Sequence, residues 1–113
     1  MKIETRYSGE VVILELQGKL THGLGDIALR QQILEVVDEG RKHVLIDLGQ
    51  VRTIDSSGLG ELIRCKVTCD REGAQVKLLN VDLKIYKLLT MTRLIGVFDM
   101  FDDEQKALES FSE

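Results

Sequence analysis

The stretch from Ile54 to Gly60, Ile-Asp-Ser-Ser-Gly-Leu-Gly, most constrains the fold because it separates two segments of different periodicity. Before it, His43–Leu48 is a run of branched apolar residues, which predicts a buried strand. After it, apolar residues recur at helical spacing: Leu59, Leu62, Ile63, Cys65, Val67 and Cys69. The sequence therefore predicts a strand, a short loop and a helix over 57–71, with two serines where the loop becomes the helix.

The start of that helix has a definite chemistry. The first N–H groups of a helix lack internal partners and carry partial positive charge, so a phosphate is stabilised there. A phosphorylated Ser56 or Ser57 would gain about −1.5 to −2 charges beside these donors. Alternatively, Asp55 and the two serines serve only to cap the helix, a role worth ~1 kcal/mol. The residues alone leave both interpretations open.

The first third of the chain predicts a hairpin and a helix. Residues 3–7 and 11–16 are rich in β-forming side chains, and Ser8-Gly9-Glu10 between them is typical of a tight turn. A helix is expected from about Asp26, as its cap, to Glu39, and Gly40 supplies the left-handed stop. On a helical wheel its apolar face would contain Ile27, Ile33, Leu34 and Val37.

The last third continues the alternation of strands and helices. A strand is expected over 75–80, a helix capped by Asp82, a short strand over 97–101 and a last helix. Asp102 and Gln105 have the spacing of a capping box for that last helix. The fold predicted is a single α/β domain over residues 1–113, with a mixed sheet of four to five strands, about four helices and an opening β-hairpin.

Residues 44–62, VLIDLGQVRTIDSSGLGEL, resemble the signature of the STAS domains, in particular the bacterial anti-sigma factor antagonists. The tail from Leu88 to Leu108 also resembles the last strand and helix of that family, so the likeness spans nearly the whole chain. The family has the STAS fold, which agrees with the fold predicted from the residues.

The resemblance implies a regulatory protein rather than an enzyme. In the family the serine before the glycine is the phosphoacceptor, which corresponds to Ser57. The implied partners are an anti-sigma factor that is also a serine/threonine kinase, and a protein phosphatase. The unphosphorylated form would bind the anti-sigma factor and release a sigma factor. The partner contacts expected beside Ser57 are Asp55, Ser56, Gly58, Leu59 and Gly60.

A second loop bears on partner choice. Many of these antagonists carry a Leu-Asp step after the second strand, whereas this chain has Leu20-Thr21-His22-Gly23. Because the loop lies near the phosphorylation site in the family, Thr21 and His22 are also expected to contact the partner. As a lone histidine in a loop, His22 has a simpler interpretation as a solvated residue without a special role.

Composition excludes several classes of partner. The 113 residues carry 15 Lys and Arg against 19 Asp and Glu, a net charge of −4, and only 4% are aromatic. The basic residues are scattered, so nucleic acid is a poor partner. No apolar run approaches the ~20 residues that cross a bilayer, and no signal peptide is evident, so a cytoplasmic location is expected. Cys65 and Cys69 share a helix face and are expected to be small buried residues.

No cofactor or metal is expected. The nucleophile elbow of serine hydrolases, Gly-x-Ser-x-Gly, is absent around Ser57, and the chain offers only His22 and His43 as bases. The glycines after Ser57 lack the continuation of a phosphate-binding loop. Two alternatives stay open: a STAS scaffold that is never phosphorylated, as a subunit of a signalling or lipid-transport assembly, and a small enzyme or nucleotide binder using the same loop. The sequence does not define the oligomeric state.

Overall fold

The computed structural model describes residues 1–112 and contains one five-stranded sheet in the order β1-β2-β3-β4-β5. Strand β1 pairs antiparallel with β2, and the remaining pairs are parallel. The strands are β1 (Lys2–Ser8), β2 (Val11–Leu20), β3 (His43–Ile54), β4 (Gln75–Leu79) and β5 (Asp99–Phe101). The helices are α1 (Gly25–Asp38), α2 (Ser56–Arg71), α3 (Leu83–Met91) and α4 (Glu104–Ser110). This is the predicted mixed sheet with an opening hairpin.

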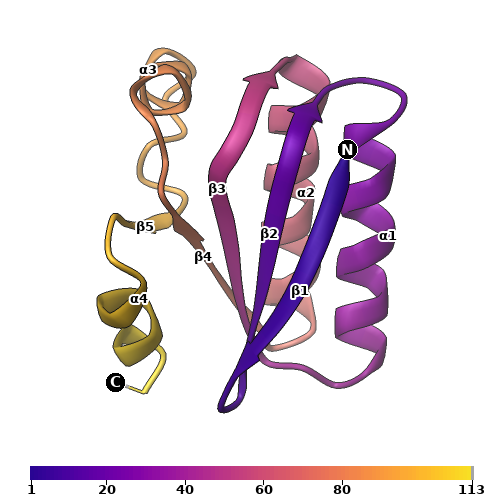
Figure 1. Ribbon diagram of the computed structural model, residues 1–113, viewed down its shortest axis with the longest axis vertical. Helices are drawn as coiled ribbons and strands as arrows, with labels where there is room; N and C mark the ends of the chain where they lie inside the picture. Colours follow the sequence, from indigo (N-terminus) through magenta and orange to yellow (C-terminus); the bar gives the residue numbers. More distant parts are fainter. Residues whose placement is uncertain (113) are drawn as a thin grey trace.

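The sheet separates two hydrophobic clusters because side chains alternate along each strand. Helices α1 and α2 lie together on one side of the sheet (Figure 1). The larger cluster lies under them and takes Val12, Leu14 and Leu16 from β2, and Val44, Ile46 and Leu48 from β3. The smaller one takes the alternate residues Val11, Ile13 and Leu45, and α4 covers it with Ala107 and Phe111. The central strands are therefore buried on both faces.

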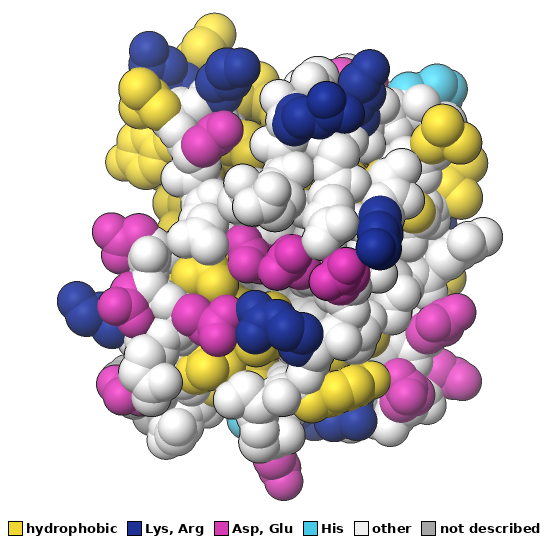
Figure 2. Space-filling model, viewed as in Figure 1, with side chains coloured by type: hydrophobic (Ala, Val, Ile, Leu, Met, Phe, Trp, Pro, Cys, Tyr) yellow, Lys and Arg dark blue, Asp and Glu magenta, His cyan; other side chains and the backbone are white. Residues whose placement is uncertain are grey.

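The face that carries α4 is only partly covered. Figure 2 shows acidic side chains across the middle of this view and basic ones along its upper edge. The strand register explains part of the acidic row, since Glu4 lies beside Glu15 and Glu15 beside Asp47. At this face Arg6 of β1 forms an ion pair with Glu104 of α4 at 2.7 Å.

Strands β2 and β3 are longer than the sequence pattern predicts. Their pairing continues to Leu20 and Ile54, beyond the expected ends at Leu16 and Leu48, with shifts of register near Gln17 and Lys19. Hydrogen bonding between the two strands continues past Gly18 and Gly49, where glycine lowers the local strand propensity, and reaches the β-forming Val51, Thr53 and Ile54. The loop before α2 is consequently reduced to Asp55.

Two expectations about helices were wrong in detail. On α1 the predicted Ile33 is buried and Val37 packs partly on the core, but Ile27 and Leu34 are 43% and 52% exposed, and Leu29 and Val36 are buried in their place because the docked helix presents a different side to the sheet. Residues at helix starts were also misassigned. Leu24 rather than Asp26 is the N-cap of α1, and Asp103 rather than Asp102 caps α4, its carboxylate accepting from the N–H of Lys106.

Candidate functional site

The parallel pairing of β2 and β3 brings two distant loops together. Leu20 pairs with Ile54 at the end of both strands, so the loop after β2 and the start of α2 lie at the same edge of the sheet. The N–H of Asp55 donates to the carbonyl of Leu20 at 3.4 Å. Thr21 and His22 therefore lie beside the serine segment, as the family resemblance implied.

Two glycines allow both helices to begin against the end of β2. A Cβ on Gly58 would lie 2.0 Å from the carbonyl oxygen of Leu20, and one on Gly25 would lie 2.3 Å from that of Lys19. Both contacts are with backbone, which cannot yield as a flexible side chain can. Gly58, expected to contact a partner, therefore packs against the protein's own strand β2, and this packing fixes the position of the first turn of α2.

Asp55 joins the two loops through its carboxylate. One oxygen accepts from the N–H of Gly58 at 2.9 Å, which makes Asp55 the N-cap of α2 and confirms its predicted capping role. The other oxygen accepts from the N–H of His22 at 3.0 Å. These two backbone hydrogen bonds, that of His22 first, hold the pKa of the Asp55 carboxyl below its usual range.

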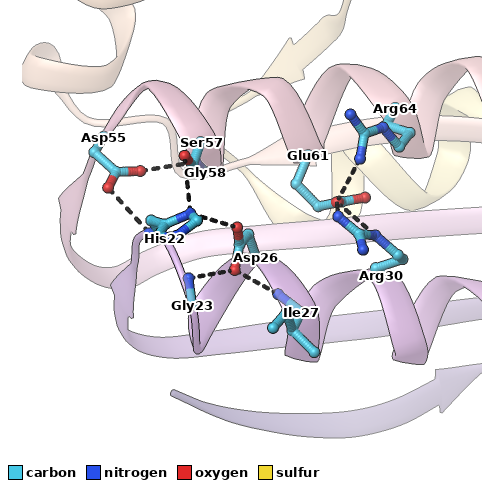
Figure 3. Close-up of polar contacts among 10 residues, drawn as sticks. All are labelled: His22, Gly23, Asp26, Ile27, Arg30, Asp55, Ser57, Gly58, Glu61 and Arg64. Carbon is cyan, nitrogen blue, oxygen red and sulfur yellow. Dashed lines mark hydrogen bonds and ion pairs between the residues drawn. The ribbon is translucent and has the colours of Figure 1, made fainter.

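Ser57 points toward His22 (Figure 3). The serine is partly exposed, and its Oγ lies 3.5 Å from Nδ1 of the imidazole. The same Nδ1 lies 3.8 Å from a carboxylate oxygen of Asp26. The other Asp26 oxygen accepts from the N–H groups of Gly23 and Ile27, so this buried carboxylate organises the loop that carries the histidine.

The three side chains do not form a catalytic triad. In a triad one ring nitrogen of the histidine faces the serine and the other faces the carboxylate. Here Nδ1 faces both Ser57 and Asp26, and a single nitrogen cannot accept from one while it donates to the other. From the sequence a base for Ser57 was hard to find, and pairing between the distant strands β2 and β3 brings His22 beside it. The arrangement nevertheless lacks the geometry of proton relay.

The remaining predicted contact residues differ in exposure. Ser56 is exposed, and the space that a Cβ on Gly60 would enter is open. Leu59 is only 5% exposed and belongs to the core, which contradicts the expectation that its side chain helps to form a contact patch. The physical reason is its place on the inward face of α2, one turn before the fully buried Leu62.

A charged cluster between α1 and α2 was not predicted. Glu61, 3% exposed, accepts from Nε of Arg30 at 3.0 Å and pairs with Nη2 of the same residue at 2.8 Å. Arg64 approaches the same carboxylate to 3.5 Å. Figure 3 shows this cluster farther along the two helices than the serine. In the sequence, only the three-residue spacing of Glu61 and Arg64 indicates an ion pair within α2. The pairing of Glu61 with Arg30 of α1 can be seen only once the two helices are packed together.

The two cysteines, the grouping of metal-binding side chains and the apolar length of the helices can also be described. Cys65 and Cys69 are free and buried, as predicted, and burial raises the pKa of both thiols, that of Cys69 to about 11. Within residues 1–112 no group of three or more His, Cys, Asp or Glu side chains could hold a metal ion. In the same residues no helix has both the length and the apolar character to cross a membrane.

Comparison with known proteins gives a family and several relatives. The family model of the STAS domain matches residues 2–107. An anti-sigma F factor antagonist of Paenibacillus polymyxa is 28% identical over 109 residues, which cover 96% of this chain and 92% of that protein.

Two solved structures share the fold. The Bacillus cell fate determinant SpoIIAA in its phosphorylated form superposes with a TM-score of 0.76 at 20% identity, covering 97% of this chain and 99% of that one. A sulfate transporter family protein from Wolinella succinogenes gives a TM-score of 0.78 at 25% identity, covering 91% and 85%. The same fold therefore occurs in a phosphorylated regulator and in a transporter family.

Proposed function

The chain belongs to the STAS domain family, and from this membership and the geometry of the site we propose that it is an anti-sigma factor antagonist switched by phosphorylation of Ser57. The observation that carries the proposal is the position of the hydroxyl. Ser57 lies partly exposed in the first turn of α2, in a segment fixed by the Asp55 cap and by the packing of Gly58 on Leu20.

The unmodified protein binds an anti-sigma factor through the surface around Ser57. This surface comprises Ser56, the bare backbone at Gly60 and the loop with Thr21 and His22. Binding of the antagonist displaces a sigma factor, which becomes free to act in transcription. A rigid helix end suits this role, because little order has to be gained when the partner docks.

The anti-sigma factor reverses the switch as a kinase. The Oγ of Ser57 attacks the γ-phosphorus of ATP, a base of the kinase takes the hydroxyl proton, and ADP leaves. The antagonist needs no cofactor of its own for this step, since the kinase supplies both nucleotide and base. A protein phosphatase restores the hydroxyl by hydrolysis.

Phosphate at Ser57 weakens binding by local electrostatics. The added charge of about −1.5 to −2 lies two residues after the capping Asp55, beside the ring nitrogen of His22 that also faces Asp26, and within the interface. Desolvation of such a charge at a contact surface is costly, and a loss of ~3 kcal/mol weakens binding more than a hundredfold. No change of fold is required.

Phosphate transfer tests the site directly. The protein, Ser57→Ala and Ser56→Ala are each incubated with the cognate anti-sigma kinase and ATP, and the intact masses are measured. The proposal predicts a gain of one phosphate in the protein and in Ser56→Ala, and no gain in Ser57→Ala. Ser56 is a matched control because it is an exposed serine in the same turn of α2. A gain that persists in Ser57→Ala contradicts the assignment.

A second candidate function is a STAS subunit that is never phosphorylated and serves as a scaffold in a signalling or transport assembly. It is favoured by the likeness to the sulfate transporter family protein, which covers most of both chains. The two functions differ in one measurement. A scaffold gains no phosphate with any kinase of the source organism, yet binds its assembly equally well as Ser57→Ala.

A further inference from the structure

The proposed switch does not explain why the side chain of His22 points toward Ser57. The His22 side chain is 82% exposed, so burial does not determine its orientation. Instead its backbone N–H is held by Asp55, and the next residue, Gly23, is held by Asp26. The two carboxylates anchor the loop from opposite sides and place the imidazole over the hydroxyl of Ser57.

Resting on the proposed phosphorylation of Ser57, we propose that His22 is an internal ligand of the phosphate, donating a hydrogen bond from its imidazole to a phosphate oxygen. The distance of 3.5 Å between Nδ1 and Oγ is long for a hydrogen bond. The phosphate oxygens extend beyond Oγ, so the modification brings an anionic acceptor closer to the ring. The contact is therefore stronger in the modified protein than in the unmodified one.

The charges around the ring favour this contact. The groups facing His22 are the carboxylate of Asp26 at 3.8 Å from Nδ1, the carboxylate of Asp55 that holds its backbone, and Ser57 itself. Phosphorylation converts the third of these from a neutral hydroxyl to an anion. A protonated imidazole would then lie between two anions, the Asp26 carboxylate and the phosphate. Among the described residues no lysine or arginine forms an ion pair with Asp26 or with Asp55.

Two consequences follow for the switch. First, the phosphorylated form links the loop after β2 to α2 through a side chain as well as through the Asp55 cap, so the loop is held more firmly. Second, the phosphate monoester has a second ionisation at about pH 6, and a hydrogen bond from the imidazole favours its doubly charged form.

The contact is tested with phosphoserine encoded genetically at position 57, so that no kinase is involved. The ionisation of the phosphate is followed by ³¹P NMR between pH 4 and 9 in this protein and in the same protein with His22→Gln. A nearby imidazolium stabilises the dianion, so the midpoint is expected to lie about half a pH unit lower when His22 is present. High salt should reduce the difference.

The matched control is His43→Gln in the same phosphoserine protein. His43 stacks on Phe111 at the other end of β3, with ring centroids 5.3 Å apart, and should leave the midpoint unchanged. Equal midpoints with and without His22 overturn the inference. Because the phosphate is encoded, that result leaves the proposed function standing, whereas a kinase that fails to modify Ser57 counts against the proposed function alone.

Discussion

Gly58 and Gly60 lie in the same turn of α2 but have opposite surroundings. A Cβ at Gly58 would collide with the carbonyl of Leu20, whereas nothing lies within 4 Å of one at Gly60. Glycine inside a helix costs roughly 0.5–1 kcal/mol relative to alanine. At Gly58 the close packing explains the glycine, while at Gly60 the fold offers no compensation. The open space at Gly60 leaves room for the backbone of the partner that the proposed function requires.

Alanine substitution should therefore have opposite effects at the two glycines. Gly58→Ala is expected to lower the free energy of unfolding by about 1–3 kcal/mol through overpacking. Gly60→Ala is expected to raise it by about 0.5–1 kcal/mol and at the same time to weaken binding of the anti-sigma factor. Urea unfolding and a binding titration measure the two quantities. A Gly60→Ala variant that is more stable and binds unchanged would show that Gly60 makes no contact.

At the scale of elements, the site depends on the start of α2 and on the capping carboxylate of Asp55. Its low pKa reflects hydrogen bonds that exist only in the folded protein. A carboxyl whose pKa is lower when folded than when unfolded stabilises the fold above its unfolded pKa, about 3.9 for aspartate. The stabilisation disappears as the pH falls through the lower, folded value.

The variant Asp55→Asn isolates the charge, because asparagine is also a good N-cap. Urea unfolding of the protein and the variant should differ most at neutral pH, with the protein more stable. The difference should hold down to about pH 4 and vanish in stronger acid. Asp82→Asn at the N-cap of α3 is a control for the substitution itself. A stability gap at Asp55 that does not change with pH would show that the carboxylate charge contributes nothing.

Features that depend only on residues close together in the sequence could be predicted. The Ser8–Glu10 turn and the caps Asp55 and Asp82 are found as predicted. These features need only neighbouring residues. The ends of β2 and β3 and the inward face of α1 depend instead on which element packs against them, which a local pattern does not contain.

The same division holds for the site. The position of Ser57 at a helix start could be predicted, because cap and helix lie within one stretch of sequence. The contact between His22 and Ser57 joins residues 35 positions apart and follows from the register of Leu20 with Ile54. The apolar spacing of α2 already placed Leu59 on the inward face of the helix, and only its additional expected role as a partner contact is contradicted.

At the scale of the whole molecule, the site and α4 lie in different parts of the fold. Ser57 is at the edge of the sheet where β2 and β3 end, and α4 packs on the face opposite to α1 and α2 (Figure 1). Helix α4 is attached by contacts of its own, including Lys77 of β4, whose Nζ donates to the hydroxyl of Ser110 at 2.9 Å. A charge added at Ser57 should therefore act locally.

Amide chemical shifts test this expectation. Comparison of the unmodified protein with the Ser57-phosphorylated one should show changes concentrated in residues 20–27 and 54–61. Residues of β5 and α4 should keep their shifts, because β5 pairs with β4 and α4 packs on the smaller cluster, which contains none of Asp55, Ser57 and His22. Widespread changes that reach α4 would instead indicate that phosphorylation rearranges the packing.

Calorimetry on one preparation can compare the affinity of the cognate anti-sigma factor for the unmodified and the Ser57-phosphorylated protein, which decides whether phosphate at Ser57 is the switch. We expect phosphorylation to weaken binding at least a hundredfold, about 3 kcal/mol, and Ser57→Ala to bind like the unmodified protein. Equal affinity of the two forms would contradict it.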